Sequence, residues 1–503
     1  MAQPIKLTAP NNTTYMQPTG LFINNEFVPS SSGQTLSTVN PFDESVITSV
    51  SSAGPEDIDL AVAASRKAFK STEWQSITGY DRGVLLTRLA ELCDRDKHIL
   101  ATIDAWDNGK PYEQALNEDL AEVISVFRYY GGWADKIHGQ TIPTSDAKLA
   151  YTRHEPIGVC GQIIPWNYPA MMAAWKLGPA LACGNTVVIK AAEQTPLSIL
   201  YLATLIREAG FPAGVVNVVN GPGATAGASI ASHPGIDKIA FTGSTVTGKA
   251  IMKAAASNLK TITLETGGKS PLIVFEDANL DQAVKWSHVG IMSNMGQICT
   301  STSRIYVHES VYEDFVEKFK QYTIENSVVG SQFDLKVNHG PQVSAAQRDR
   351  ILRYLEAAKK EGAKLVLGEN QPPNNAKGYF ANPIIFKDTD RNMTPVREEV
   401  FGPFVVIQSF SSQKDAIDKA NDTEYGLGAA IFTENITRAH TVAALIEAGM
   451  VWINSSQDSH FAIPFGGYKQ SGIGRELGEY ALSAYTQVKA IHGQLIVSSY
   501  NIV

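Results

Sequence analysis

The chain has 503 residues, of which 44% are hydrophobic and 18% are charged, a composition ordinary for a globular protein of about three domains. Its formal net charge of -8 and its pI near 5.7 argue against a nucleic-acid partner. No apolar run approaches the ~18 residues that a membrane helix needs, so no membrane partner is expected.

Targeting signals and cysteine usage predict a cytoplasmic protein. The first twenty residues contain one lysine, no arginine and no apolar stretch, which argues against a secretory signal or a transit peptide. The four cysteines are too few for a disulfide framework, and no two of them have metal-ligand spacing, so we expect no metal site. A reducing compartment fits this usage best.

The N-terminal part is predicted to be mainly helical. Residues 1–19 are expected to form a loose arm, and residues 22–28 a hairpin that turns at Asn24 and Asn25. Helical spacing of apolar residues predicts three helices, at 56–69, 81–104 and 114–131. On the third helix Asp119 and Glu122 share one face, which a solvated helix surface also explains.

From residue 149 onward, apolar strands alternate with helices. This alternation predicts parallel sheets covered by helices on both faces, whose ligands bind at the carboxyl ends of the strands. Strands are predicted at 149–156, 159–164, 186–190, 215–219, 238–241, 272–275, 304–308, 364–367, 405–407, 429–431 and 450–453. The clearest helices are predicted at 170–182, 197–209, from about 245, 311–322 and 346–361.

The predicted fold class is therefore α/β, with two doubly wound parallel-sheet domains that join near residue 267. The first domain is expected to comprise residues 1–135 and 155–267, and the second residues 268–478. The segments 136–154 and 479–503 fit neither core and are set apart as a small extension.

Cys299 stands in a stretch of small and polar residues, 294–301. Gly296 permits a tight bend before it, and Thr300 and Ser301 after it favour a helix start or a turn. Peptide dipoles at such a junction would lower the pKa of the thiol and favour the reactive thiolate. A buried, inert cysteine is the alternative explanation.

Two turns at predicted strand ends are candidates for nucleotide binding. The Gly-rich segment 243–248 opens a helix, as phosphate sites do, although its spacing matches neither Gly-x-Gly-x-x-Gly nor a Walker motif. Lys190 and Glu193 follow another strand, where a carboxylate can accept from ribose hydroxyls and would repel a 2′-phosphate. A plain tight turn and two solvated loop charges are the respective alternatives.

Two further motifs carry chemistry. Asn167, in the segment 165–169, has an amide that can donate to an oxyanion. Glu265 lies in an apolar, Gly-rich segment, 264–269, where the pKa of a carboxyl group is raised so that it can act as a base near neutrality. A capping or turn acid is the alternative for Glu265.

Taken together, these motifs resemble the NAD(P)-dependent aldehyde dehydrogenase family, in its non-acylating, hydrolytic type. The pieces span nearly the whole chain in the family's order. They are Pro-Trp-Asn at 165–167, Lys190 with Glu193, Phe-Thr-Gly-Ser at 241–244, Leu-Glu-Thr-Gly-Gly-Lys at 264–269, Gly-Gln-Ile-Cys at 296–299, Glu-Glu-Val-Phe-Gly-Pro at 398–403 and Pro-Phe-Gly-Gly at 464–467.

The resemblance implies a mechanism. Cys299 would attack the aldehyde, its oxyanion would sit between the Asn167 side chain and the Cys299 backbone N–H, and Glu265 would activate water to hydrolyse the thioester. Relatives that transfer the acyl group to coenzyme A typically lack this glutamate, so hydrolysis is favoured. Lys176 and Glu476 occupy family positions proposed as a proton path for Glu265.

The resemblance also implies a Rossmann-like cofactor domain followed by a catalytic domain. NAD would be preferred over NADP because Glu193 repels a 2′-phosphate. The segments 136–154 and 479–503 would form the bridging sheet of a homodimer or a dimer of dimers. The residues expected at the cofactor are Ile163, Pro165, Trp166, Lys190, Glu193, Gly223, Phe241, Gly243, Ser244, Gly267, Gln347, Glu399 and Phe401.

For the small-molecule aldehyde the resemblance implies a pocket lined by Asp119, Glu122, Tyr168, Met172, Trp175, Ser293, Ile298, Thr300, Ser455, Ser459 and Phe465. Small residues at Ser293 and Ser459, where relatives for short aldehydes carry aromatics, predict a wide mouth and broad aliphatic specificity. Betaine aldehyde enzymes tend to have tryptophan at the positions of Ser293 and Phe465, so a quaternary-ammonium cage is disfavoured. Asp119 and Glu122 match an acidic pair of aminoaldehyde relatives, which keeps ω-aminoaldehydes open.

Two alternatives to this function stay open. A non-catalytic, NAD-binding structural protein can share the fold, although such proteins often lose catalytic residues and this chain keeps Cys299, Glu265 and Asn167. Hydrolysis of esters or thioesters by Cys299 without redox chemistry is the second alternative.

Overall fold

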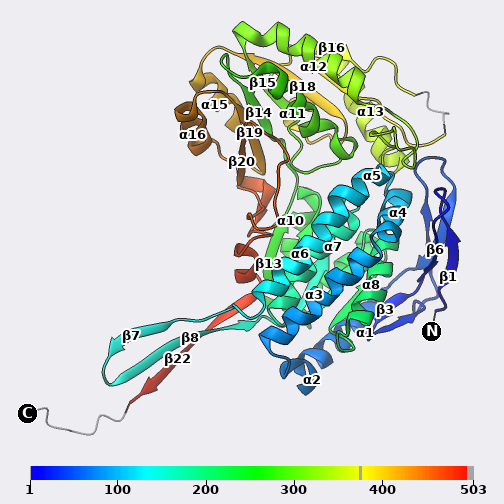
Figure 1. The fold of residues 1–503 in the computed structure, drawn as a ribbon, viewed down its shortest axis with the longest axis vertical. Helices are drawn as coiled ribbons and strands as arrows, with labels where there is room; N and C mark the ends of the chain where they lie inside the picture. The colour runs from blue at the N-terminus through cyan, green and yellow to red at the C-terminus, as the bar shows by residue number, and fades with distance from the viewer. Residues whose placement is uncertain (1, 373–376, 496–503) are drawn as a thin grey trace, which may run out of the picture.

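The computed structural model describes residues 2–372 and 377–495. Two large sheets, each with helices on both faces, form the body of the protein, and a narrow three-stranded sheet projects from it as an arm (Figure 1). This architecture confirms the predicted α/β fold with two parallel-sheet domains and a β extension. Among the described residues, no helix is long and apolar enough to cross a membrane.

The first sheet has eight strands in the order β21–β13–β12–β9–β10–β11–β3–β4. The central five, β13 to β11, are parallel, and β3, β4 and β21 complete the sheet through antiparallel pairs. The bounds are β3 (Leu21–Ile23), β4 (Glu26–Val28), β9 (Val159–Ile163), β10 (Thr186–Lys190), β11 (Val216–Val219), β12 (Lys238–Thr242), β13 (Thr261–Glu265) and β21 (Gly472–Ile473).

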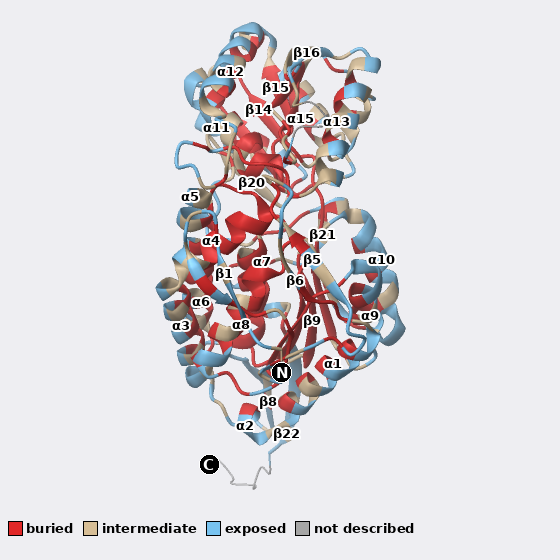
Figure 2. Cartoon of the chain, turned by 90° about the vertical axis from the view of Figure 1, so that its right-hand side faces the viewer, coloured by how far each residue is buried: buried red, intermediate tan, exposed pale blue. Residues whose placement is uncertain are grey.

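Helices cover both faces of this sheet, so β9, β10, β11 and β12 are buried along their whole length and show no polar alternation (Figure 2). One face is covered by α3 (Gly79–Arg95), α4 (Lys97–Asn108), α6 (Leu120–Trp133), α7 (Pro169–Ala182) and α8 (Leu197–Ala209). The other face is covered by α1 (Pro55–Lys70), α9 (Ala228–Ser232) and α10 (Thr245–Ala255).

The second sheet has seven strands in the order β16–β17–β18–β15–β14–β19–β20, all parallel except β16. The strands are β14 (Pro271–Val274), β15 (Arg304–His308), β16 (Lys364–Leu367), β17 (Ile384–Lys387), β18 (Phe404–Phe410), β19 (Gly428–Phe432) and β20 (Met450–Ile453). Its helices are α11 (Leu280–Met292) and α12 (Tyr312–Asn326) on one face, and α13 (Ala345–Lys360), α15 (Gln413–Asn421) and α16 (Ile436–Leu445) on the other.

The arm consists of β7 (Thr141–Ser145), β8 (Lys148–Pro156) and β22 (Thr486–Gln494). β22 pairs with β8 antiparallel along all nine residues, so the two segments that fit neither core join each other in one sheet. Every residue of β7 is exposed, which leaves this strand as an open edge. Residues 496–503 of the predicted extension lie outside the described residues.

The remaining elements are short. They are β1 (Ile5–Thr8), β2 (Thr14–Gln17), β5 (Thr35–Val39), β6 (Val46–Ser51), α2 (Thr72–Gln75), α5 (Tyr112–Gln114), the π-helical turns η1 (Ala115–Asp119) and η2 (Gly223–Gly227), α14 (Thr394–Arg397), α17 (Tyr480–Ser483) and the 3-10 turns η3 (Ala256–Asn258), η4 (Ser293–Gly296), η5 (Glu309–Val311) and η6 (Lys469–Ser471).

Three local predictions were wrong. The N-terminal arm is an ordered hairpin of β1 and β2, because Tyr15 packs edge-on against Tyr201 of α8 and Gln17 donates to the Leu197 carbonyl. The helix predicted at 81–104 is two helices that break at Asp96, and the helix predicted at 114–131 begins with a π turn. The domain boundaries also need a correction, since β21 lies within 268–478 but pairs with β13 of the first sheet.

Candidate active site

A cavity of about 580 Å³ lies between the two large sheets and contains most of the predicted site residues. Cys299, Glu265 and Asn167 all line it. Of the predicted cofactor residues it contains Pro165, Trp166, Gly243, Ser244, Gly267, Gln347, Glu399 and Phe401. Of the predicted substrate residues it contains Asp119, Glu122, Tyr168, Met172, Trp175, Ser293, Ile298, Thr300, Ser459 and Phe465, but not Ser455.

The loop that carries Cys299 has a strained backbone. Asn294, Met295 and Gly296 have left-handed φ angles of 47°, 55° and 73° in succession. A Cβ at Gly296 would lie 2.1 Å from the carbonyl oxygen of Gly402, so only glycine allows this close approach. Consecutive left-handed residues cost free energy and persist only where the surroundings enforce them, as they do around functional sites.

The environment of the Cys299 thiol differs from the predicted one. Cys299 and Thr300 form a turn, closed by the Ser301 N–H on the Ile298 carbonyl, so the residues after the sulfur do not begin a helix. Burial raises the pKa of the Cys299 thiol well above its ordinary value, and the neighbouring Glu265 carboxylate raises it further. The expectation of a lowered thiol pKa was therefore wrong, because desolvation and a like charge both act against the thiolate.

Glu265 is the last residue of β13 and points into the cavity beside Cys299. It is 3% exposed, and burial raises the pKa of its carboxyl group to about 8, as the apolar sequence around it predicted. Among the described residues its Oε1 has no hydrogen-bond partner. A carboxyl group with this pKa can exchange a proton with water or substrate near neutral pH.

A network of amides fixes the segment 166–167 against the nucleophile loop. The Asn167 side chain donates to the carbonyl of Gln297 at 2.9 Å. Asn294 donates to the carbonyl of Asn167 at 3.1 Å, and Asn108 donates to the carbonyl of Trp166 at 2.7 Å. The Asn167 amide has a second N–H, and because Asn167 lines the cavity, this N–H can donate to an oxyanion there.

Behind Glu265, Lys176 of α7 and Glu476 form a buried ion pair, and the Lys176 ammonium also donates to the Thr242 hydroxyl at 2.7 Å. Both charged groups are nearly inaccessible, at 0% and 5% exposure. Phe465 and Glu476 exchange two backbone hydrogen bonds of 2.7 Å. The Lys176–Glu476 ion pair therefore also holds the wall segment that carries Phe465.

Breaking this pair is expected to destabilise the protein. Lys176→Met should leave the Glu476 carboxylate buried without a cation and lower the free energy of unfolding by about 3–5 kcal/mol. The matched double variant Lys176→Met/Glu476→Leu should recover a large part of that loss, because it leaves no buried charge. Denaturant unfolding monitored by tryptophan fluorescence measures both values, and equal stability of the single and double variants would contradict the expectation.

The residues predicted at the cofactor lie at the carboxyl ends of neighbouring parallel strands. Ile163, Lys190 and Phe241 belong to β9, β10 and β12, and Gly223 begins the turn that follows β11, outside the cavity of Cys299 but along the same edge. Lys190 donates to Glu193 at 3.3 Å. This edge is where ligands of doubly wound sheets bind.

The edge also has the local features that a dinucleotide needs. Gly243 and Ser244 line the cavity, and Ser244 caps α10, so the N-terminus of this helix begins at the cavity wall, where phosphate groups can bind. A Cβ at Gly267 would lie 2.4 Å from the Glu399 carboxylate, so glycine keeps that carboxylate close to the backbone. Glu399 accepts from the Gly268 N–H at 2.9 Å, and Phe401 meets Trp166 edge-on at 5.3 Å. The residues present therefore fit a dinucleotide.

The two acids predicted at the mouth differ in their partners, although burial raises the pKa of both to about 7. Asp119 is 1% exposed and forms a buried ion pair with Lys110, whose ammonium lies 3.9 Å from the centre of the Tyr168 ring. The carboxylate of Asp119 is therefore neutralised by Lys110. The Glu122 Oε1 is buried and has no hydrogen-bond partner among the described residues, and burial raises the pKa of Glu122 to about 7. The solvated-surface explanation for this pair was wrong.

Several site residues were missed by the sequence analysis. Glu118, Met171, Thr242, Val289, Arg350 and Gln457 also line the cavity. Asn108, Lys110, Asn294 and Gln297 hold the nucleophile loop or neutralise Asp119. Asn294 could have been found, because asparagine tolerates a left-handed backbone and precedes Gly296 by two residues. Nothing local marks Gln457, whose partner Thr300 is distant in sequence.

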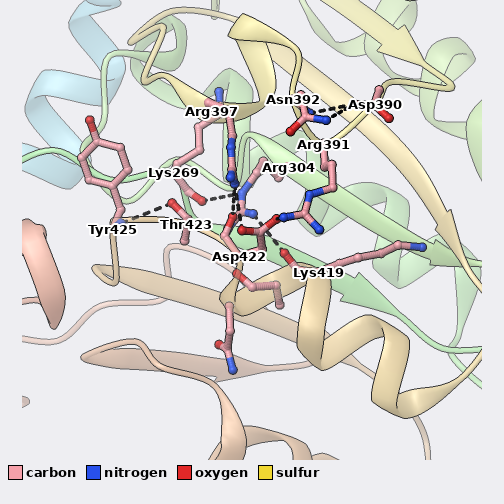
Figure 3. Close-up of polar contacts among 12 residues, drawn as sticks. Lys269, Arg304, Asp390, Arg391, Asn392, Arg397, Lys419, Asp422, Thr423 and Tyr425 are labelled. Atoms are coloured by element: carbon pink, nitrogen blue, oxygen red, sulfur yellow. Dashed lines mark hydrogen bonds and ion pairs between the residues drawn. The ribbon is translucent and has the colours of Figure 1, made fainter.

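A second cavity, of about 440 Å³, lies in the second domain beside β15 and α15. Figure 3 shows Arg391 and Arg397 converging on Asp422, at 3.2 Å and 3.0 Å. Arg304 is buried there and donates to the carbonyl oxygens of Lys269 and Ala420, at 2.8 Å and 2.9 Å. These charged side chains pair with other side chains or with backbone carbonyls of the protein. The cluster therefore connects β15 to helix α15, and we assign no catalytic role to it.

The fold and the cavity define a class: a two-domain α/β protein with a thiol, a carboxyl group and an amide at a site between two parallel sheets. Within that class the comparison is specific, because the sequence profile of the aldehyde dehydrogenase family matches residues 27–491. The chain belongs to the aldehyde dehydrogenase family.

Relatives with this family name cover nearly the full length. The chain is 54% identical to an aldehyde dehydrogenase of Emericella nidulans over 96% of both chains, and 50% identical to retinaldehyde dehydrogenase 3 of Mus musculus over 97% and 95% of the chains. The structure of the NAD+ complex of an aldehyde dehydrogenase from Bacillus cereus matches with a TM-score of 0.93 and 50% identity, covering 95% of this chain and 97% of that one. Betaine aldehyde dehydrogenase from Staphylococcus aureus, in complex with NAD+, matches with a TM-score of 0.93 and 37% identity, covering 97% of each chain.

Proposed function

We propose that this chain oxidises an aldehyde to the carboxylic acid with NAD+ and water. The observation that carries the proposal is the pairing of the Cys299 thiol with the Glu265 carboxyl group in one cavity, next to a strand edge that fits a dinucleotide. The family membership and the NAD+ complexes of its structural relatives support the cofactor. NAD+, when bound, would accept the hydride that the thiohemiacetal loses. Loss of this hydride converts the thiohemiacetal to the thioester.

The residues of the chain supply the remaining steps. Cys299 attacks the aldehyde carbon, and the free N–H of the Asn167 amide and the Cys299 backbone N–H stabilise the oxyanion. Because the pKa of Glu265 is about 8, much of this residue is protonated near pH 7. The protonated carboxyl group repels the Cys299 thiolate less than a carboxylate would. In its ionised form Glu265 takes a proton from water, which attacks the thioester and releases the acid.

The proton that Glu265 receives needs a route away from the buried site. The Lys176–Glu476 pair is charged, buried and close enough to affect the pKa of Glu265. One carboxylate oxygen each of Glu265 and Glu476 has no partner among the described residues, so both can accept a hydrogen bond from a relaying group. We assign the pair to this relay.

The cofactor preference is proposed to be NAD over NADP. Glu193 follows β10 at the edge where the adenine ribose would lie, and its carboxylate would repel a 2′-phosphate. Lys190 donates to Glu193 at 3.3 Å and holds the carboxylate in place. A ribose with two free hydroxyls can instead donate to the same carboxylate.

The proposed substrates are aliphatic aldehydes, with a broad specificity for chain length. The stripe of Tyr168, Met172 and Trp175 forms an apolar wall, and Phe465 packs on Trp175 with ring centres 4.8 Å apart. Ser293 and Ser459 line the cavity with small side chains, which leaves room for longer chains. Apolar contact area, rather than a charge or hydrogen bond, would then provide most of the binding free energy.

The proposal is tested by initial rates at saturating NAD+ with a chain-length series of neutral aldehydes and one ω-aminoaldehyde. Absorbance of the reduced nicotinamide should increase with time, and the optimum of the series should identify the substrate class. Wild-type protein that binds NAD+ but oxidises no aldehyde would favour a structural role. Ester hydrolysis without reduced nicotinamide would favour the non-redox alternative.

ω-Aminoaldehydes are the second candidate, which rests on the acid of the predicted pair that has no cation. The Glu122 carboxylate lines the cavity without a cation within ion-pair distance among the described residues, whereas Asp119 is neutralised by Lys110. A distant ammonium on the substrate would pair with Glu122 and keep it ionised, despite its pKa of about 7 in the free protein.

Glu122→Gln is expected to raise the KM for an ω-aminoaldehyde about 10-fold and to leave the KM for a neutral aldehyde of equal length within about 2-fold. The reason is that glutamine keeps the size of the side chain but loses its charge. Steady-state kinetics with both substrates measure the difference. Equal effects on the two aldehydes would exclude a charge-selective role for Glu122.

The projecting arm is proposed to mediate assembly into a homodimer or a dimer of dimers. The exposed edge of β7 can pair with another strand, and exposed apolar side chains such as Ile142, Leu149 and Val488 lie on this sheet. The cytoplasmic location stays a prediction.

A further inference from the structure

Gln457 and Thr300 form a two-bond contact directly beside the nucleophile. The Thr300 hydroxyl donates to Gln457 Oε1 at 2.5 Å, and Gln457 Nε2 donates back to the Thr300 carbonyl at 3.0 Å. Thr300 follows Cys299 in the chain and is 2% exposed. Both residues line the cavity, so the contact, which we term the amide clamp, joins two parts of its wall.

The clamp joins the loop that carries Gln457 to the nucleophile loop. Residues 454–460 follow β20, and other hydrogen bonds anchor them as well. The Asn454 amide exchanges two hydrogen bonds of 3.0 Å with the backbone of Thr433, and Gln282 Nε2 donates to the Asn454 carbonyl at 3.0 Å. The Asn454 N–H donates to the Ile431 carbonyl at 2.8 Å, and Trp452 Nε1 donates to the Asp458 carbonyl at 2.8 Å. None of these contacts reaches the nucleophile loop. The amide clamp therefore connects the loop of the cavity wall to the residue after Cys299.

The backbone of Gln457 is strained in a way that the clamp helps to offset. Its φ of 61° lies in the left-handed region, which glutamine rarely adopts. Such a conformation persists where contacts enforce it. An amide side chain accepts from a hydroxyl through its oxygen and donates to a carbonyl through its nitrogen, so glutamine is matched to both groups of Thr300.

We propose that Gln457 is a positioning and specificity-determining residue, whose amide clamp on Thr300 sets the width of the cavity next to Cys299. This inference rests on the proposed aldehyde oxidation. Because Thr300 occupies both polar ends of the Gln457 amide, the wall presents the aliphatic stem of Gln457 to the substrate. A linear aldehyde fits against this fixed wall, whereas a branched or cyclic one needs the loop to move outward.

The test is a double-mutant cycle that weakens the clamp from the Thr300 side and removes it from the Gln457 side, with side chains of similar size. Thr300→Val, Gln457→Leu and the double variant are compared with wild type for kcat and KM on hexanal and on cyclohexanecarbaldehyde. Thr300→Val loses the hydroxyl bond and Gln457→Leu loses both bonds, so each should lower kcat/KM for hexanal by about 5- to 10-fold. The loss for cyclohexanecarbaldehyde should be smaller, so the ratio of the two specificity constants should fall about 5-fold in Gln457→Leu. The double variant should be no worse than Gln457→Leu, because that variant alone already removes both bonds.

Three further measurements separate positioning from general damage. Thr300→Ser keeps the hydroxyl and should recover most of the activity that Thr300→Val loses. Asp458→Asn changes the neighbouring exposed side chain, which does not line the cavity, and should leave both rates unchanged. Thermal unfolding of each variant checks that the fold persists.

The outcomes distinguish the two proposals. Additive losses in the double variant, or equal losses for both aldehydes, would overturn the role of Gln457 while leaving the aldehyde oxidation intact. A wild-type protein that oxidises neither aldehyde would overturn the proposed function itself.

Discussion

Cys299→Ala is expected to abolish aldehyde oxidation, with a fall in kcat/KM of at least about 10⁴-fold. Of the four cysteines, only Cys299 is accessible, and it alone lines the cavity with Glu265; Cys93, Cys160 and Cys183 are buried elsewhere. Without the sulfur, no covalent adduct can form, and the hydride has no thiohemiacetal to leave. Initial rates at saturating NAD+ measure the loss.

Two controls make this result specific. NAD+ binding to Cys299→Ala, measured by quenching of tryptophan fluorescence, should stay within about 3-fold of wild type, because the cofactor edge does not use the thiol. Cys183→Ala removes a buried thiol at the end of α7 and should retain oxidation. Substantial activity in Cys299→Ala would mean that another group is the nucleophile.

Glu265→Gln is expected to separate the first half of the reaction from the second. Steady-state kcat should fall about 10²–10⁴-fold, the range for loss of a general base. The first turnover should persist as a burst of about one reduced nicotinamide per active site, because attack by Cys299 does not need the carboxylate. Glutamine also removes the second cause of the raised thiol pKa, so the thiolate should form more easily. Stopped-flow absorbance resolves the burst.

The same variant gives a pH test. The folded pKa of Glu265 is about 8, so in wild type the hydrolytic rate should rise as pH increases through that value and the base ionises. Glu265→Gln should lack this inflection. A variant with no burst would mean that Glu265 acts before the thioester forms, and an unchanged pH profile would mean that another group is the base.

Periodicity and motif chemistry predicted much of the architecture. The uniformly apolar strands 159–164, 186–190 and 238–241 predicted a parallel sheet, and they form β9, β10 and β12 at its centre. The helix start after Ser244 is also as predicted, with Ser244 as its cap. Such features are local, because a strand that is buried on both faces has an almost uniformly apolar sequence.

The short elements show why other parts were missed. β13 and β17 were not predicted although they are as long as strands that were. β13 alternates threonine with apolar residues and ends at Glu265, so it lacks the uniformly apolar run that a fully buried strand shows. The N-terminal hairpin was missed because its order comes from contacts with α8, far along the chain. Its own sequence has the polar, proline-containing character of a loose arm.

What the sequence by itself determined is therefore the α/β class, the two sheets and the identities of Cys299, Glu265 and Asn167 as candidates. Only the tertiary structure decided their electrostatic states: burial and Glu265 raise the pKa of Cys299, and Lys110 neutralises Asp119. It also decided the pairing of β8 with β22 and the amide clamp between Thr300 and Gln457. The physical reason is the distance over which each effect acts. Propensity and periodicity act between near neighbours in sequence. Desolvation and charge interactions depend on distances in space, which only the folded structure sets.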